Sequence, residues 1–119
     1  MESQTPYFSR EQAKSFASAL YHVASIDEIH ESEWTVILEF LNELGYPELA
    51  EGLAETPFSL EEAVTLFPTV HARALLVKAC VQVIGADHRV TSEEREALEF
   101  MRRALMPSVS LADLLATVE

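Results

Sequence analysis

Cysteine, glycine and uninterrupted apolar sequence are all scarce in this chain of 119 residues. Its single cysteine, Cys80, has no partner for a disulfide within the chain, so the fold depends on its core alone. A lone thiol inside an apolar segment is expected to be inert packing rather than a nucleophile. A chain of this length buries about two-thirds of its unfolded surface and can fold as one domain without metal or disulfides.

The scarcity of glycine and of long apolar runs excludes several kinds of protein. Gly45, Gly52 and Gly85 form neither a phosphate-cradling loop nor a Gly-x-Ser-x-Gly elbow. The longest apolar stretch is interrupted by Lys78 and Gln82, and it is too short to cross a hydrocarbon layer of about 30 Å. The polar N-terminus shows no signal peptide. We therefore expect a soluble, cytoplasmic protein that is not an enzyme.

Basic side chains are missing from half of the chain. Between Lys14 and Arg73 there is no lysine or arginine, and residues 1–62 carry a charge of −11 out of the total of −12. Such a surface repels phosphate backbones and anionic lipids, so we expect neither nucleic-acid nor membrane binding. Acidity of this kind keeps small proteins soluble, and it also suits a basic protein partner or a cation. The candidates for partner binding are four glutamates: Glu39, Glu43, Glu51 and Glu55.

What the chain has in abundance is apolar residues at helical spacing, framed by helix signals. Ser9, Ser59 and Thr91 each precede an acid or amide by three residues, the pattern of a capping box. Gly45 suits the end of a helix, and Pro68 is expected to end one helix and start the next. These signals predict an all-α fold of about six to seven helices, over 10–25, 31–44, 47–54, 60–67, 71–85, 92–105 and 111–115. We expect a single domain over 1–119, with a tail at 1–8 and a linker and short C-terminal helix, whose docking is not predicted, at 107–119.

The strongest pattern is the helix-loop-helix from Ala72 to Leu105. Its first helix is apolar over most of its circumference, with His71, Lys78 and Gln82 on one narrow stripe. A helix of this kind must be surrounded by other helices, so we expect it at the centre of the fold.

The same design occurs a second time in the chain. When the chain is aligned with itself so that Ile29 falls on Val90, Glu33 falls on Glu94. The match continues along the following helices, with Ile37 on Leu98, Phe40 on Met101 and Leu44 on Leu105. The sequence therefore predicts two related halves, each with a carboxylate at the top of an otherwise apolar helix face.

Those two carboxylates allow two interpretations. Glu33 and Glu94 can each cap the N-terminus of their own helix. Alternatively, Asp27, Glu33, Asp87 and Glu94 can together bind a divalent cation. Neither loop alone fits a calcium-binding EF-hand, because most positions that should supply oxygens do not, so acids from both loops would have to converge. The four histidines have neither zincin nor di-iron spacing.

The two turn-and-helix sequences, Ser25–Glu33 and Ala86–Leu98, resemble the duplicated signature of the tellurite-resistance TerB-like family. That family's pattern is broadly Ala-Asp-Gly-x-Ile/Val-x-x-x-Glu after an apolar helix. The residues that match it are Asp87, Val90 and Glu94 in the second copy, and Ile29 and Glu33 in the first. His88 and Asp27 stand at the glycine positions, and Ile26 replaces the first-copy aspartate, which weakens any metal site built from the family's acids.

The resemblance covers residues 10–106 and implies an all-helical fold of about seven helices. It also implies a bacterial, cytoplasmic role in the response to tellurite and other chemical stress, together with other Ter proteins and not as an enzyme. We therefore expect a non-enzymatic module that presents the acidic face of residues 27–62 to a protein partner. No cofactor is firmly implied, and the alternative is a divalent-metal-binding protein.

Overall fold

A computed structural model describes residues 8–26, 28–86 and 90–116, and every regular element within these ranges is a helix. In chain order these elements are α1 (Arg10–Ala24), α2 (Glu31–Leu44), the 3-10 helix η1 (Pro47–Glu55), α3 (Leu60–Leu66), α4 (Val70–Ile84), α5 (Ser92–Leu105) and α6 (Leu111–Leu115). The all-α prediction is confirmed, and the predicted bounds of α2 and α5 agree with the structure. None of the described helices is both long and apolar enough to cross a bilayer.

Local capping signals set most of the helix ends. The Ser9 backbone N–H donates to the Gln12 side chain at 2.9 Å, and the Gln12 N–H donates to Ser9 Oγ at 3.2 Å, which completes the capping box of α1. Gly45 ends α2 with a φ of 91°, a conformation that favours glycine. The prediction that Pro68 starts α4 is wrong, because Thr69 is the N-cap: its Oγ1 accepts from the Ala72 N–H at 3.1 Å.

The segment that follows α2 is helical but not α-helical. Pro47 begins it as predicted, yet η1 has the tighter 3-10 geometry over all nine of its residues. Gly52 lies in its interior, where glycine costs an α-helix about 1 kcal/mol relative to alanine. A weak propensity and a short length therefore favour the 3-10 form here.

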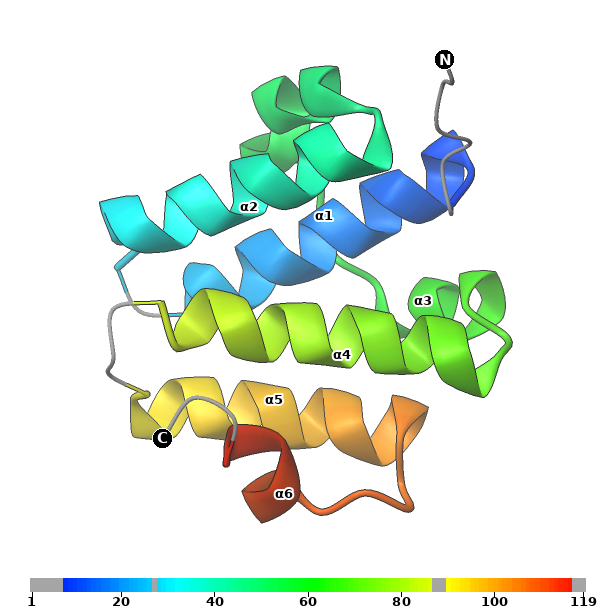
Figure 1. The fold of residues 1–119 in the computed structure, drawn as a ribbon, viewed down its shortest axis with the longest axis vertical. Helices are drawn as coiled ribbons and strands as arrows, with labels where there is room; N and C mark the ends of the chain where they lie inside the picture. Colours follow the sequence, from blue (N-terminus) through cyan, green and yellow to red (C-terminus); the bar gives the residue numbers. More distant parts are fainter. Residues whose placement is uncertain (1–7, 27, 87–89, 117–119) are drawn as a thin grey trace.

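The helices are arranged around a central pair, α1 and α4, which lie side by side (Figure 1). α2 packs on one side of the pair and α5 on the other, so the two predicted halves are the hairpins α1–α2 and α4–α5. η1 packs on α1 and α2, α3 packs on α1 and α5, and α6 packs on α4 and α5. No Cα atom of α2 lies within 8 Å of a Cα atom of α5.

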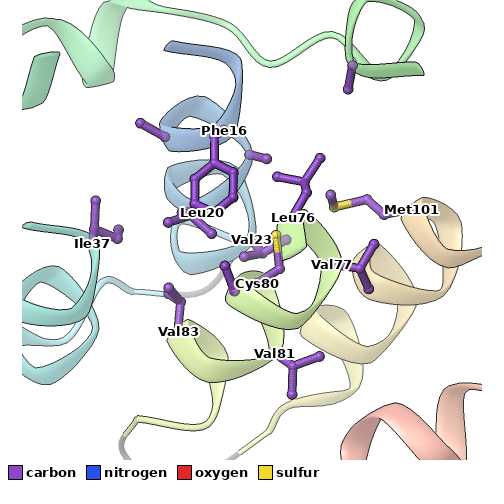
Figure 2. Packing of buried hydrophobic residues seen from close by; sticks show 14 of the residues in the cluster. Phe16, Leu20, Val23, Ile37, Leu76, Val77, Cys80, Val81, Val83 and Met101 are labelled. Atoms are coloured by element: carbon purple, nitrogen blue, oxygen red, sulfur yellow. The ribbon is translucent and has the colours of Figure 1, made fainter. Parts of the chain in front are cut away.

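The core forms where α1 and α4 meet. Phe16, Leu20 and Val23 of α1 lie beside Leu76 and Cys80 of α4 (Figure 2). The exposed stripe predicted for α4 is confirmed, because His71, Lys78 and Gln82 are all exposed.

The apolar residues Ala13, Phe16, Leu20 and Val23 recur at helical spacing and predict a single inward face for α1, but its observed environment is different. All six residues of Ser15–Leu20 are buried, because α2, η1, α3, α4 and α5 surround the helix. Ser18, which helical spacing places on the outer face with Lys14 and His22, is only 3% exposed. The small side chains of α1 let its neighbours approach from several sides.

The C-terminal helix docks through its apolar residues. Leu114 and Leu115 are buried, and α6 packs against α4 and α5. The guanidinium of Arg102 on α5 donates to the Val109 carbonyl oxygen at 2.7 Å, which ties the preceding linker to α5. This contact fixes where α6 meets the bundle.

Candidate functional site

The two carboxylates at the α2 and α5 N-termini serve their own helices. Glu33 and Glu94 are 0% and 3% exposed, and each occupies the third position of its helix. Glu33 Oε1 accepts from the His30 N–H at 2.9 Å, and Glu94 Oε1 accepts from the Thr91 N–H at 3.0 Å. In the second copy Thr91 Oγ1 also accepts from the Glu94 N–H at 3.1 Å. The capping interpretation is thus confirmed for both residues.

The other two members of the candidate cation site cannot be compared with them. Asp27 and Asp87 lie outside the described residues. Glu33 and Glu94 belong to helices that the α1–α4 pair separates (Figure 1). Within residues 8–26, 28–86 and 90–116, no group of three or more His, Cys, Asp or Glu side chains is arranged to hold a metal ion.

The acidic half of the chain contains a groove that unites two of the partner-binding candidates. Glu39 and Glu43 lie one turn apart on α2 and are both exposed. They line a hollow of about 450 Å³ between α2 and α4, here called the α2–α4 groove, together with Val36, Phe40 and Gln82. Val36 and Phe40 are half-buried and form an apolar floor of this groove, beside the two carboxylates on the surface of α2. Glu51 and Glu55 are exposed on η1 and do not line it.

The glutamates of this surface are not neutralised by neighbouring bases. Among the described residues, Glu39, Glu43, Glu51 and Glu55 form no ion pair. Arg10, which with Lys14 makes up the basic residues of the acidic half, pairs with Glu48 instead. Like charges four residues apart on a helix destabilise it by about 0.2–0.5 kcal/mol, so Glu39 and Glu43 carry a small cost that a bound cation would relieve.

A second hollow was missed by sequence reasoning. It occupies about 320 Å³ beside α1, is here called the α1 cavity, and is lined by Glu11, Lys14, Ser15, Ser18, Thr56, Pro57, Phe58, Ser59, Glu62 and Leu66. The signal that would have pointed to it is the polar run on α1, in which Glu11, Ser15 and Ser18 recur at helical spacing among alanines. Helical spacing alone assigns that run to solvent.

One titrating group of altered acidity packs against Phe58, a residue of the cavity lining. The His22 ring lies against the Phe58 ring, with 5.5 Å between their centroids. Partial burial in this contact lowers the pKa of His22 below its usual value of 6.5, because desolvation disfavours the charged imidazolium. The contact with Phe58 therefore favours the neutral form of the imidazole.

No protein-family model, no curated protein and no solved structure matches this chain. The two hollows and their side chains are therefore the basis for inferring what the molecule does.

Proposed function

We propose that this protein is a non-enzymatic, TerB-like interaction module whose α2–α4 groove binds a basic, partly apolar segment of a partner protein. The observation that carries the proposal is the pairing of Glu39 and Glu43 over the apolar floor of that groove, with no ion-pair partner among the described residues.

The chemistry of the groove fits lysine or arginine side chains. Their aliphatic stems can lie along apolar side chains while the charged ends reach carboxylates. Val36 and Phe40 provide that apolar contact, and the face of an aromatic ring such as Phe40 also attracts cations. The Phe40 ring packs against the Phe16 ring, with 5.7 Å between their centroids. This contact restricts the orientation of Phe40 in the absence of a partner. Such preorganisation lowers the entropic cost of binding.

The charge of the acidic half supports the same kind of partner. Residues 1–62 carry −11 of the total charge of −12, so a basic segment would be attracted before contact. Attraction of this kind raises association rates and weakens with ionic strength, because salt screens exposed charges over about 8–10 Å. We therefore expect binding to weaken steeply as salt is added.

The stress-related part of the proposal rests on the resemblance of Ser25–Glu33 and Ala86–Leu98 to the TerB-like signature. The self-alignment that places Ile29 on Val90 also superimposes the bounds of the helices that follow the two turns, with Glu31–Leu44 of α2 on Ser92–Leu105 of α5. That agreement supports a duplicated design. We propose that the partner is engaged in a bacterial cytoplasm during exposure to tellurite or another chemical stress.

Affinity capture with matched charge reversals tests the groove. The tagged protein, the double variant E39K/E43K and the control E93K/E96K are each exposed to lysate from tellurite-treated cells. The control reverses the same number of charges at exposed positions of α5, away from the groove. Partners retained by the wild type and the control but lost from E39K/E43K support the proposal, and partners that survive E39K/E43K contradict it.

Quantitative binding follows with the basic segment of a captured partner. Reversing two exposed glutamates removes two attractions of up to about 1 kcal/mol each and adds repulsion, so we expect the Kd to rise by about tenfold to a hundredfold. The variant E51K/E55K reports whether the partner extends over η1. An equal loss of affinity in E39K/E43K and in E93K/E96K would mean that net charge, and not the groove, drives binding.

A further inference from the structure

An exposed aromatic side chain lies on the outer side of α5. Phe100 is 67% exposed, whereas the other described phenylalanines are buried or half-buried. α5 is at one edge of the row formed by α2, α1, α4 and α5, so no other long helix covers its outer side (Figure 1). A hollow of about 330 Å³ lies beside the ring and is bordered by Leu111 of α6 and by charged residues of α5. Aromatic side chains are enriched at protein–protein contacts, and the charges around Phe100 indicate which partner fits.

Those charges are ordered along α5. Glu96 lies one turn before Phe100, and Arg103 lies about one turn after it. Glu96 forms no hydrogen bond or ion pair with another described residue. Arg103, whose side chain is 74% exposed, donates from Nε to Glu99 Oε2 at 2.8 Å, and its Nη groups have no acceptor among the described residues. Glu96, Phe100 and Arg103, here called the α5 face, thus place an apolar group between an available carboxylate and an available guanidinium.

This order is complementary to itself. If two copies of α5 cross in antiparallel directions at Phe100, a two-fold axis places Glu96 of each copy opposite Arg103 of the other. The Nη groups of Arg103 can bind that carboxylate while Nε remains on Glu99. The two Phe100 rings meet near the axis and are removed from water together, with Leu111 at the edge of the contact.

The opposite edge of the molecule does not have this property. α2 carries a partly exposed apolar residue, Leu38, but there is no lysine or arginine between Lys14 and Arg73. A two-fold axis at α2 would therefore bring carboxylates together. Residues 1–62 carry −11 of the total charge of −12, which leaves −1 for residues 63–119. A second copy meets the least repulsion on the half that contains α5.

We propose that this protein forms a two-fold symmetric dimer through the α5 face, with Phe100 at its centre and two reciprocal Glu96–Arg103 ion pairs. The contact consists of one helix and the edge of α6, which is less than a permanent interface buries, so we expect a Kd on the order of 10–500 µM. The α2–α4 groove includes no residue of the α5 face, so dimerisation does not depend on the proposed function.

Sedimentation equilibrium of the full chain from about 20 µM to 1 mM measures the dimer Kd. The mass of the wild type is expected to rise towards that of a dimer and not beyond it. Phe100→Ser is expected to raise the Kd at least about tenfold, because the central apolar contact is lost. Val70→Ser is the matched control: it removes an apolar side chain that is 81% exposed at the start of α4, and it is expected to leave the Kd within about twofold.

Charge reversals test the two-fold arrangement. E96R and R103E each change both symmetry-related ion pairs into repulsions, so each is expected to raise the Kd at least about tenfold. An equimolar mixture of the two variants restores both attractions: the arginine introduced at position 96 faces the glutamate introduced at position 103, and native Arg103 faces native Glu96. The Kd of the mixed dimer is expected to lie within about threefold of the wild-type value. E51R makes the same change of net charge on η1 as E96R does on α5, and it is expected to leave the Kd within about twofold.

Far-UV circular dichroism checks that each variant is folded. The proposal is overturned if the wild type stays monomeric at about 1 mM, if it forms species larger than a dimer, if Phe100→Ser dimerises as tightly as the wild type, or if the mixture associates no more tightly than E96R or R103E alone. E39K/E43K is expected to dimerise as the wild type does. E93K/E96K is expected to lose the dimer and to keep the partners of the groove, so failure of either proposal is distinguishable from failure of the other.

Discussion

Replacing Ser15 by alanine should stabilise the protein, although the residue lies in a buried part of α1. Both Ser15 and Ser18 are nearly inaccessible, at 5% and 3% exposure. They differ in one respect: Ser18 Oγ donates to the Lys14 carbonyl oxygen, whereas Ser15 Oγ has no hydrogen-bond partner among the described residues. The pair therefore compares an unsatisfied with a satisfied hydroxyl in the same helix.

The expected magnitudes follow from that difference. Alanine is the better helix former by about 0.5 kcal/mol at either position. An unsatisfied buried hydroxyl costs about 1–3 kcal/mol, and Ser15→Ala removes that cost, so with the helix gain the free energy of unfolding should rise by about 1.5–3.5 kcal/mol. Ser18→Ala instead loses a bond whose net value is about 0.5–1.5 kcal/mol, so its unfolding free energy should fall by about 0.5 kcal/mol after the helix gain.

Urea denaturation followed by far-UV circular dichroism measures both changes, provided that the slope with denaturant is unchanged. In a thermal melt, Ser15→Ala should raise Tm by about 4 °C for each kcal/mol gained. If Ser15→Ala destabilises the protein as much as Ser18→Ala does, the Ser15 hydroxyl is bonded in solution. That result would refute the reasoning.

Three further predictions concern other parts of the molecule. Glu94→Ala should lower the unfolding free energy by about 1 kcal/mol, equally with calcium or a chelator present, because Glu94 caps α5; a calcium-dependent loss in urea melts would contradict this. Hydrogen bonds from Arg102, and to a lesser extent from Arg103, lower the pKa of Glu99 from 4.5 to about 2. The ionised Glu99 therefore contributes its full stability above pH 4.5, and this contribution is lost as the pH falls toward 2. Glu99→Gln should flatten the dependence of Tm on pH in that window, and an unchanged curve would refute the ion pairing. Burial raises the pKa of the Cys80 thiol, so a thiol reagent at neutral pH should modify it only as fast as the protein opens, and rapid modification of the native protein would show that Cys80 is accessible.

The helix bounds were predictable because their causes are local. Ser9 with Gln12, and Thr91 with Glu94, form capping boxes that involve only neighbouring residues. Gly45 ends α2 through its own positive φ. Signals of this kind act whatever the rest of the fold does. Where the local signal is ambiguous, the prediction failed: Pro68 was expected to start the helix, but the threonine directly after it is the N-cap and the helix begins at Val70.

The surroundings of each helix were less predictable, and α1 shows why. Its apolar spacing predicts one inward face, yet Ser15–Leu20 is buried throughout. Apolar periodicity identifies the hydrophobic face of a helix. The number of helices that pack around it also depends on how closely their backbones can approach its own. Alanine and serine permit close approach without adding hydrophobicity, so the burial of Ser15 and Ser18, and hence the α1 cavity, is invisible to that pattern.

The candidate site was predictable in part for a similar reason. Glu39 and Glu43 follow from charge and spacing, because exposed acids one turn apart on a helix share a face. That they border a groove with Gln82 depends on the packing of α2 on α4, a contact between segments far apart in the chain that no local signal encodes. Glu51 and Glu55 have the same spacing and charge but lie on η1, outside the groove.

Comparison of the two halves distinguishes residues that both hairpins share from residues that occur in one hairpin only. In the self-alignment of the two halves, the buried capping glutamates coincide, Glu33 on Glu94, and both make the same bond to their own helix N-terminus. The groove glutamates do not recur, because Glu39 falls on Phe100 and Glu43 on Ala104.

Ser15 behaves in the same way as the groove glutamates, since its counterpart in that alignment is Leu76, a buried apolar residue of the core. A role in holding the hairpin together would be needed in both halves, as the capping carboxylates are. The acids of the α2–α4 groove and the unsatisfied Ser15 hydroxyl occur in one half only and carry a cost there. For the exposed acids of the groove, a cost that the sister hairpin lacks is better explained by binding than by folding.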